Sequence, residues 1–298
     1  MKMLRKLTPD GDIADIIEMP DGCRGISWNK VSRTLFFTDW DRNYICTLKD
    51  GEIEDFRRWP KMNNPRGIFV LPHGNTAVIE EDNDMSFKTL MISYRGELSL
   101  SSPIRMKFFG NTVFRKSKSP LEFRKVNGVA WNKAMSGALI SSERGNCIIG
   151  AKRNRGVFNV LGNGKTGFSV SNDPLECMFD SPRGICCNDT GNLVFVADTG
   201  NSVIRCFKWA SNSFTPHMLA GSPLISGHED GSWLTTKFTT PGDMAYSDGT
   251  VYVVDDNMIC SLSVESQTSE MVYTSPYSLS AICSLPGGVI YFIEESNG

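Results

Sequence analysis

The sequence predicts an all-β protein assembled from repeats of one small antiparallel sheet. Short stretches of alternating apolar residues recur along the whole chain, and clusters of Gly, Asn and Asp separate them. No stretch carries a sustained helical period of apolar residues. Internal self-similarity therefore decides the fold, because repeated sheets stack into a limited set of architectures.

The clearest copy of the repeat lies between residues 182 and 207. It begins with Pro-Arg-Gly-Ile at 182–185, passes a Gly-Asn turn at 191–192, and enters an apolar strand that ends at Asp198. A third strand follows at 203–207. This passage resembles the NHL repeat, whose typical core reads Pro-x-Gly-Ile, then Gly-Asn-Leu-x-Val-Ala-Asp, then Asn and Ile. The resemblance implies an NHL-type six-bladed β-propeller.

Five further copies are more divergent. A small residue opens each copy at positions 25, 67, 128, 184, 243 and 281, in steps of 42, 61, 56, 59 and 38 residues. The 17 residues after the sixth position and the first 25 residues together make 42, which equals the first step. We therefore expect one domain over residues 1–298, with the N-terminal strand closing the last blade and removing the exposed sheet edges. A basic insertion, about residues 94–125, lies between blades two and three.

Composition places the chain among ordinary folded proteins. Of 298 residues, 40% are apolar and 21% are charged, and the net charge is −2, which argues against general binding of polyanions. No apolar run is long enough to span a membrane, and the basic start lacks the apolar segment of a signal peptide. The nine cysteines include no CxxC pair, so we expect reduced, buried thiols and a cytoplasmic location.

One end of such a propeller gathers charged side chains around the central channel. The turn before each first strand and the turn after each second strand lie on this face. The alternative is that these carboxylates accept hydrogen bonds from their own turns and pair with the arginines between blades. The candidates at this channel mouth are Arg24, Arg66, Arg183, Asn127, Asp243, Asp39, Glu80, Glu143, Asp198, Asp255 and Glu294.

Charge is unevenly distributed along the chain. Residues 103–165 hold 13 Lys or Arg and only two acidic residues, and phenylalanines are interleaved with the basic ones. Basic residues with aromatic ones are typical of single-stranded nucleic acid contacts, although an acidic protein surface suits this sector equally well. The candidates in this basic sector are Arg105, Lys107, Arg115, Lys116, Lys118, Arg124, Lys125, Lys152, Arg153 and Arg155.

The sequence provides no recognisable catalytic set. The three histidines occupy no equivalent repeat position, and no nucleophile elbow, phosphate loop or HExxH motif is present. Similarity to calcium-dependent lactonases would cast Asn127 and Asp243 as metal ligands, but no Glu begins a first strand. We therefore assign no catalytic residue, no metal ligand and no cofactor, with a divalent ion in the channel as the alternative.

The leading hypothesis is a non-enzymatic interaction module, a scaffold that binds a protein partner through loops on one propeller face. One alternative is RNA binding through the basic sector. A second alternative is a lactonase-like, metal-dependent hydrolase at the central channel. We expect neither a membrane nor a small molecule as the partner.

Overall fold

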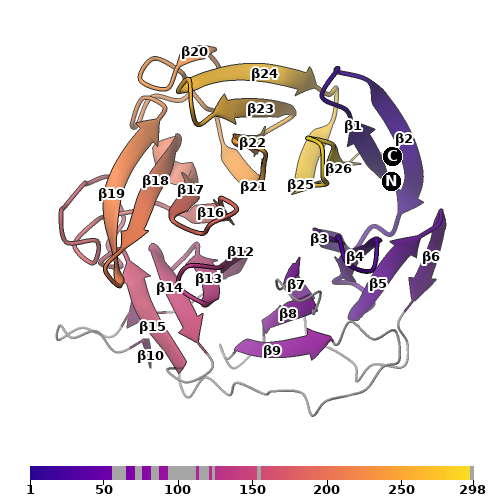
Figure 1. The fold of residues 1–298 in the computed structure, drawn as a ribbon, viewed down its shortest axis with the longest axis horizontal. Coiled ribbons are helices and arrows are strands. Elements are labelled where there is room, and N and C mark those ends of the chain that lie inside the picture. The colour runs from indigo at the N-terminus through magenta and orange to yellow at the C-terminus, as the bar shows by residue number, and fades with distance from the viewer. Residues whose placement is uncertain are drawn as a thin grey trace. The chain divides into compact units, whose positions relative to one another are not determined.

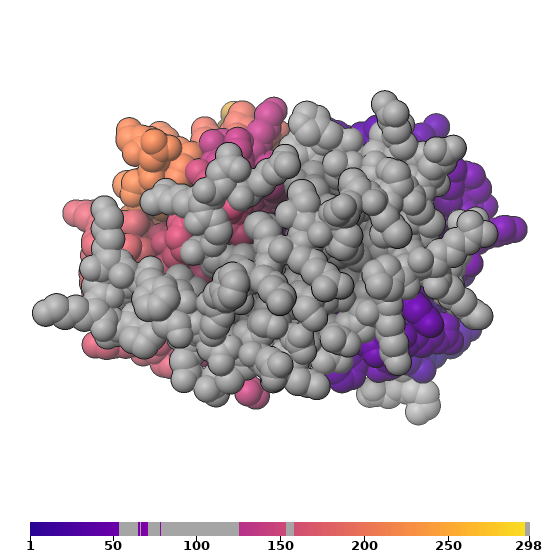
Figure 2. Space-filling model, turned by 90° about the horizontal axis from the view of Figure 1, so that it is seen from below, coloured from indigo at the N-terminus to yellow at the C-terminus, as the bar shows by residue number. Residues whose placement is uncertain are grey.

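A computed structural model describes residues 1–55, 65–70, 76–81, 87–92, 112–113, 121–122, 125–152 and 156–295 of the chain. Figure 1 colours these residues, and Figure 2 colours those whose side chains are described. The chain consists of two compact units, Met1–Phe109 with Ser275–Gly298, and Gly110–Thr274. No helix in the described ranges is both long and apolar enough to cross a bilayer. All nine cysteines are described; none forms a disulfide, and eight of them are buried.

The first unit contains the sheet that joins the two ends of the chain. Its strand order is β2 (Ile13–Met19), β1 (Lys2–Leu7), β26 (Ile290–Glu295) and β25 (Ser278–Ser284). β1 pairs with β26 along its whole length, from Lys2 opposite Glu295 to Leu7 opposite Ile290 (Figure 1). Leu4 and Leu7 are buried in this sheet. The prediction that the N-terminal segment completes the last blade is therefore confirmed.

Two further sheets complete the described part of the first unit. One contains β3 (Cys23–Asn29), β4 (Thr34–Asp39), β5 (Tyr44–Lys49) and β6 (Glu52–Asp55). The other contains β7 (Pro65–Val70), β8 (Thr76–Glu81) and β9 (Phe87–Ile92). Apolar residues that alternate along the strands form a core between sheets, centred on Leu4, Phe37 and Ile293.

The second unit contains three sheets of four or five strands. The first contains β12 (Val126–Asn132), β13 (Gly137–Ser142), β14 (Cys147–Lys152) and β15 (Gly156–Leu161). The second contains β16 (Pro182–Cys187), β17 (Leu193–Asp198), β18 (Val203–Ala210) and β19 (Ser213–Ala220). The third contains β21 (Pro241–Ser247), β22 (Thr250–Asp255), β23 (Met258–Ser263) and β24 (Thr268–Thr274), with β20 (Gly231–Ser232) on its edge. A hairpin of β10 (Thr112–Val113) and β11 (Leu121–Glu122) and the short helix η1 (Thr199–Asn201) are separate elements.

The first strands of these three sheets lie next to one another, β12 beside β16 and β16 beside β21. Buried aromatic residues fill the spaces between the sheets. Phe179 and Phe207 lie in the core between the first two sheets. Phe195 and Phe238 lie in the core between the second and the third. The linkers that precede β16 and β21 contribute Phe179 and Phe238, so the linkers are part of the core.

The same irregularity occurs at the start of all six first strands. In each, the pairing with the second strand skips at least one residue, which forms a β-bulge. A bulge redirects side chains away from the regular alternation of a strand. Its sixfold recurrence identifies the sheets as copies of one repeat. The bulges hold residues 24–25, 66, 127–128, 183–184, 242–243 and 280.

Candidate functional site

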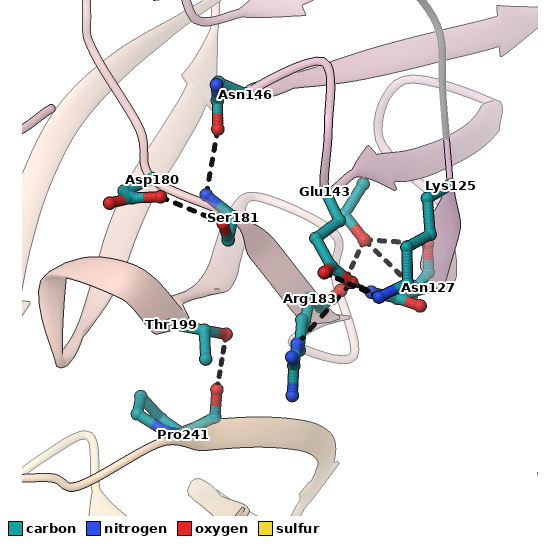
Figure 3. Close-up of polar contacts among 11 residues, drawn as sticks. Lys125, Asn127, Glu143, Asn146, Asp180, Ser181, Arg183, Thr199 and Pro241 are labelled. Atoms are coloured by element: carbon teal, nitrogen blue, oxygen red, sulfur yellow. Dashed lines mark hydrogen bonds and ion pairs between the residues drawn. The ribbon is translucent and has the colours of Figure 1, made fainter. Parts of the chain in front are cut away.

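Four polar side chains of the second unit meet where the bulges of β12 and β16 face the end of β13 (Figure 3). We call Lys125, Asn127, Glu143 and Arg183 the bulge cluster. Lys125 Nζ lies 2.7 Å from Glu143 Oε1, and Asn127 Nδ2 donates a hydrogen bond to Glu143 Oε2. Arg183 Nε lies 3.6 Å from Glu143 Oε2. Both carboxylate oxygens are thus engaged, and two cations surround one anion.

Exposure divides this cluster into an inner and an outer part. The side chain of Glu143 is 12% exposed, whereas that of Arg183 is 45% exposed. The backbone carbonyl of Lys125 accepts the Glu143 N–H at 2.9 Å, which fixes the backbone of Glu143. The outer part of the cluster therefore presents the guanidinium of Arg183 to solvent.

The backbone around Arg183 is held by close contacts between neighbouring first strands. A Cβ atom on Gly128 would collide with the Arg183 carbonyl oxygen, and one on Gly184 would collide with the Gly242 carbonyl oxygen. Ser141 Oγ accepts the Gly128 N–H at 2.8 Å and also contacts the Arg183 carbonyl oxygen. These contacts tie the bulge of β16 to β12 and to β13.

A different side chain connects the next pair of blades. Thr199 Oγ1 donates a hydrogen bond of 2.6 Å to the Pro241 carbonyl, which ties β21 to the end of β17 (Figure 3). Asp243, the candidate in the β21 bulge, accepts the N–H of Met244 at 3.0 Å. Hydroxyl groups at or just after the second strands thus bind backbone carbonyls at or beside the neighbouring bulges.

Asp198 is the last residue of β17 and is completely buried. It is opposite Pro182, as Ser142 is opposite Val126 in the preceding blade, so Glu143 lies one position further along than Asp198. One of the Asp198 oxygens accepts the Asp180 N–H at 2.8 Å, and the other lies 3.2 Å from Arg205 Nη1. Burial raises the pKa of the Asp198 carboxyl to about 6, although the nearby Arg205 charge opposes that rise. This carboxylate belongs to the interior of the blade.

Arg205 extends this interior contact to the linker that precedes β16. It donates hydrogen bonds to the Met178 carbonyl at 2.6 Å and to the Ser169 carbonyl at 2.8 Å. Its guanidinium carbon also lies 4.2 Å from the ring centroid of Phe179. The sequence interpretation missed Arg205. Its signal was a charged residue on the face of β18 where alternation requires an apolar one, between Val203 and Phe207.

The other described carboxylates at the second-strand ends are also engaged. Asp255 accepts the N–H groups of Thr239 and Thr240 at 2.6–3.0 Å, and burial raises the pKa of its carboxyl. In the first unit, Asp39 accepts the Arg42 N–H at 3.0 Å. Glu294 lies 3.1 Å from the guanidinium of Arg5, a residue of β1.

Arg24, in the β3 bulge, is exposed, and its guanidinium carbon lies 5.7 Å from the centroid of the Trp40 ring. Arg66 and Glu80 lie in the paired strands β7 and β8, and their side chains are not among those described. Of the basic sector, Lys125 joins the bulge cluster and Lys152 lies 5.7 Å from the Trp209 ring centroid. The other basic-sector candidates lie outside the described residues: Arg105, Lys107, Arg115, Lys116, Lys118, Arg124, Arg153 and Arg155.

No protein-family model matches the chain, and no curated protein matches it. Solved structures are similar over nearly the whole chain. A nutrient-binding protein from Bacteroides ovatus has a TM-score of 0.65 at 9% identity, covering 99% of this chain and 77% of that one. A gluconolactonase from Xanthomonas campestris has a TM-score of 0.59 at 11% identity, covering 91% and 85%. Virginiamycin B lyase from Staphylococcus aureus has a TM-score of 0.53 at 13% identity, covering 99% and 88%.

These similarities show the fold. The chain is an all-β propeller, and its structural neighbours belong to six-bladed propeller families. One of the three neighbours binds nutrients, one is a lactonase and one is a lyase. Propellers thus carry unrelated activities, and function has to be argued from the residues of this chain.

Proposed function

We propose that this protein is an NHL-type propeller without catalytic activity, which binds an acidic segment of a protein partner through Arg183 of the bulge cluster. One observation carries the proposal. In the second unit, the carboxylates of Glu143, Asp198 and Asp255 already bind backbone N–H groups or basic side chains, whereas Arg183 is exposed. The bulge cluster therefore offers hydrogen-bond donors and positive charge.

Arginine suits this role for physical reasons. Its planar guanidinium carries five donors, binds carboxylates through two parallel hydrogen bonds and is weakly hydrated, so it is enriched at protein interfaces. The Nε of Arg183 faces Glu143, which Lys125 and Asn127 also engage. The cluster keeps a net charge of about +1. The fixed backbone of the β16 bulge lowers the entropy cost of binding.

The same geometry argues against a cation at the channel mouth of this unit. Asn127 and Asp243 lie in the bulges of β12 and β21, and the strand between them carries Arg183 in its own bulge. A guanidinium at that place repels a divalent cation. Asn127 also directs its amide nitrogen toward Glu143. These contacts favour a partner with carboxylates over a metal-dependent hydrolase.

Comparative affinity purification tests the proposal. The tagged full chain and its Arg183→Glu and Lys208→Glu variants serve as baits, with quantitative mass spectrometry of the recovered proteins. Lys208 is exposed on β18, so its variant is a matched charge reversal outside the bulges. We expect one group of proteins to be lost from Arg183→Glu and kept by the native chain and Lys208→Glu. Identical recovery with all three baits would contradict the proposal.

A further inference from the structure

Three side chains of the second unit bring a nitrogen, an oxygen and a sulfur atom to one place. Asp255 ends β22, and Cys260 is the third residue of β23. Val253 is opposite Cys260 and Asp255 is opposite Met258, so Asp255 and Cys260 are diagonal neighbours on one face of the sheet. His228 comes from the linker between β19 and β21. The ligand atoms of His228, Asp255 and Cys260 all lie within 4.8 Å of one another.

The linker that carries His228 is fixed to this sheet. Trp233 and Phe238 of the linker share a buried apolar cluster with Cys260. The backbone N–H of Trp233 donates to the Gln267 carbonyl at 2.8 Å, and its ring N–H donates to the Thr268 carbonyl at 3.1 Å. His228 therefore lies on an ordered segment beside β24.

Each of the three groups has capacity for a further ligand bond. Asp255 Oδ2 accepts one backbone N–H, and a carboxylate oxygen has a second lone pair. In the described part of the chain, no hydrogen bond holds the Cys260 sulfur. The His228 side chain is 26% exposed, and its Nε2 lies 3.7 Å from Asp230, the kind of carboxylate that orients a ligating histidine. Because His228 is partly exposed, an ion can reach the site from solvent, while Asp255 and Cys260 are buried.

We infer that His228, Asp255 and Cys260 form a binding site for a zinc-like divalent cation, which would tie the linker to the β21–β24 sheet. Zinc accepts imidazole nitrogen, carboxylate oxygen and thiolate sulfur, and three protein ligands leave a fourth position for water. A carboxylate and a thiolate together neutralise the two positive charges of the ion. Burial raises the pKa of both acids, and a bound cation would compensate that desolvation. This inference is independent of the proposed partner binding.

Cobalt titration tests the site, because Co²⁺ bound to a thiolate absorbs in the near ultraviolet and a tetrahedral Co²⁺ ion absorbs in the visible. The full chain is freed of metal with a chelator, reduced with a phosphine and titrated with Co²⁺, then with Zn²⁺. We expect both absorptions to saturate at one equivalent and to disappear when Zn²⁺ displaces Co²⁺. Cys260→Ser should remove the thiolate band, and His228→Ala should weaken the apparent affinity at least about tenfold.

Two variants serve as controls. Cys206→Ser changes another buried thiol of the same apolar cluster, and His217→Ala changes an exposed histidine of β19; both should titrate like the native chain. A native chain without a thiolate band, or a band that persists in Cys260→Ser, would overturn the inference. If Cys260→Ser does not fold, His228→Ala decides, because its imidazole is partly exposed. A Zn²⁺-induced rise in melting temperature equal in His228→Ala and the native chain would then refute the site.

Discussion

Glu143 directly follows β13, and Asp198 is the last residue of β17, so these carboxylates of neighbouring blades lie one position apart in the repeat, and their surroundings differ. Asp198 is completely buried, and its cation, Arg205, comes from the third strand of the same sheet. Glu143 is partly exposed, and one of its cations, Arg183, comes from the bulge of the next blade. Each of these two blades has a carboxylate at or just after the end of its second strand. A cation from the same sheet gives a pair in the interior of the blade, whereas a cation from the next blade leaves a charged group at the surface.

The largest effect is expected from breaking the buried pair. Arg205→Met would remove the guanidinium that binds Asp198 and the carbonyls of Met178 and Ser169. This change should lower the free energy of unfolding by about 3–5 kcal/mol. Arg183→Met removes an exposed cation and should cost at most about 1 kcal/mol. Urea unfolding measures both. Equal destabilisation by the two variants would show that burial of the pair does not distinguish the blades.

A pH dependence should also separate the two positions. The Asp198 carboxyl has its pKa raised from 3.8 to about 6 by burial, so the native state binds its proton more tightly than the unfolded state does. The resulting stabilisation is complete below pH 3.8 and is lost as the pH rises through 6. It corresponds to roughly 3 kcal/mol at 1.36 kcal/mol per pKa unit.

Unfolding free energies of the native chain and Asp198→Asn, measured from pH 4 to pH 7.5, test this dependence. The stability of the native chain relative to the variant should fall as the pH rises, because the amide does not titrate. A difference that stays constant over this range would contradict the raised pKa.

A smaller effect is expected at the connection that positions Arg183. Ser141→Ala removes the hydroxyl that accepts the Gly128 N–H and contacts the Arg183 carbonyl, and should cost about 1–2 kcal/mol. Ser266→Ala changes an exposed turn serine and should cost less than about 0.5 kcal/mol. Thermal unfolding of both variants provides the comparison. Equal melting temperatures of Ser141→Ala and Ser266→Ala would show that the Ser141 hydroxyl does not fix the bulge.

The sequence predicted the elements that the repeat itself specifies. The spacing of the small residues predicted that β1 would complete the sheet of β26, and the structure pairs these strands from Lys2 to Leu7. The first-strand turns that open each copy fall at the bulges, so Asn127 and Arg183 occupy equivalent positions. Alternation and turn residues are local signals, and they suffice for strands and their register.

Such local signals could not predict the contacts that the linkers make. Arg205 reaches the linker carbonyls of Ser169 and Met178, and His228 meets Asp255 and Cys260 because its linker folds onto the sheet. Each of these contacts joins residues whose spacing varies from blade to blade. The partners of Glu143 likewise come from the neighbouring blade as well as its own, so their identity depends on packing between sheets.

The claim that the Glu143–Arg183 pair serves binding and the Asp198–Arg205 pair serves folding is tested most directly by measuring partner recovery and unfolding in the same two variants. Arg183→Glu should keep the native melting temperature and lose the proteins recovered by the native chain. Arg205→Met should melt earlier and, below its melting temperature, recover those proteins in full. If Arg183→Glu instead recovers them as efficiently as Lys208→Glu does, the bulge cluster is not the binding site.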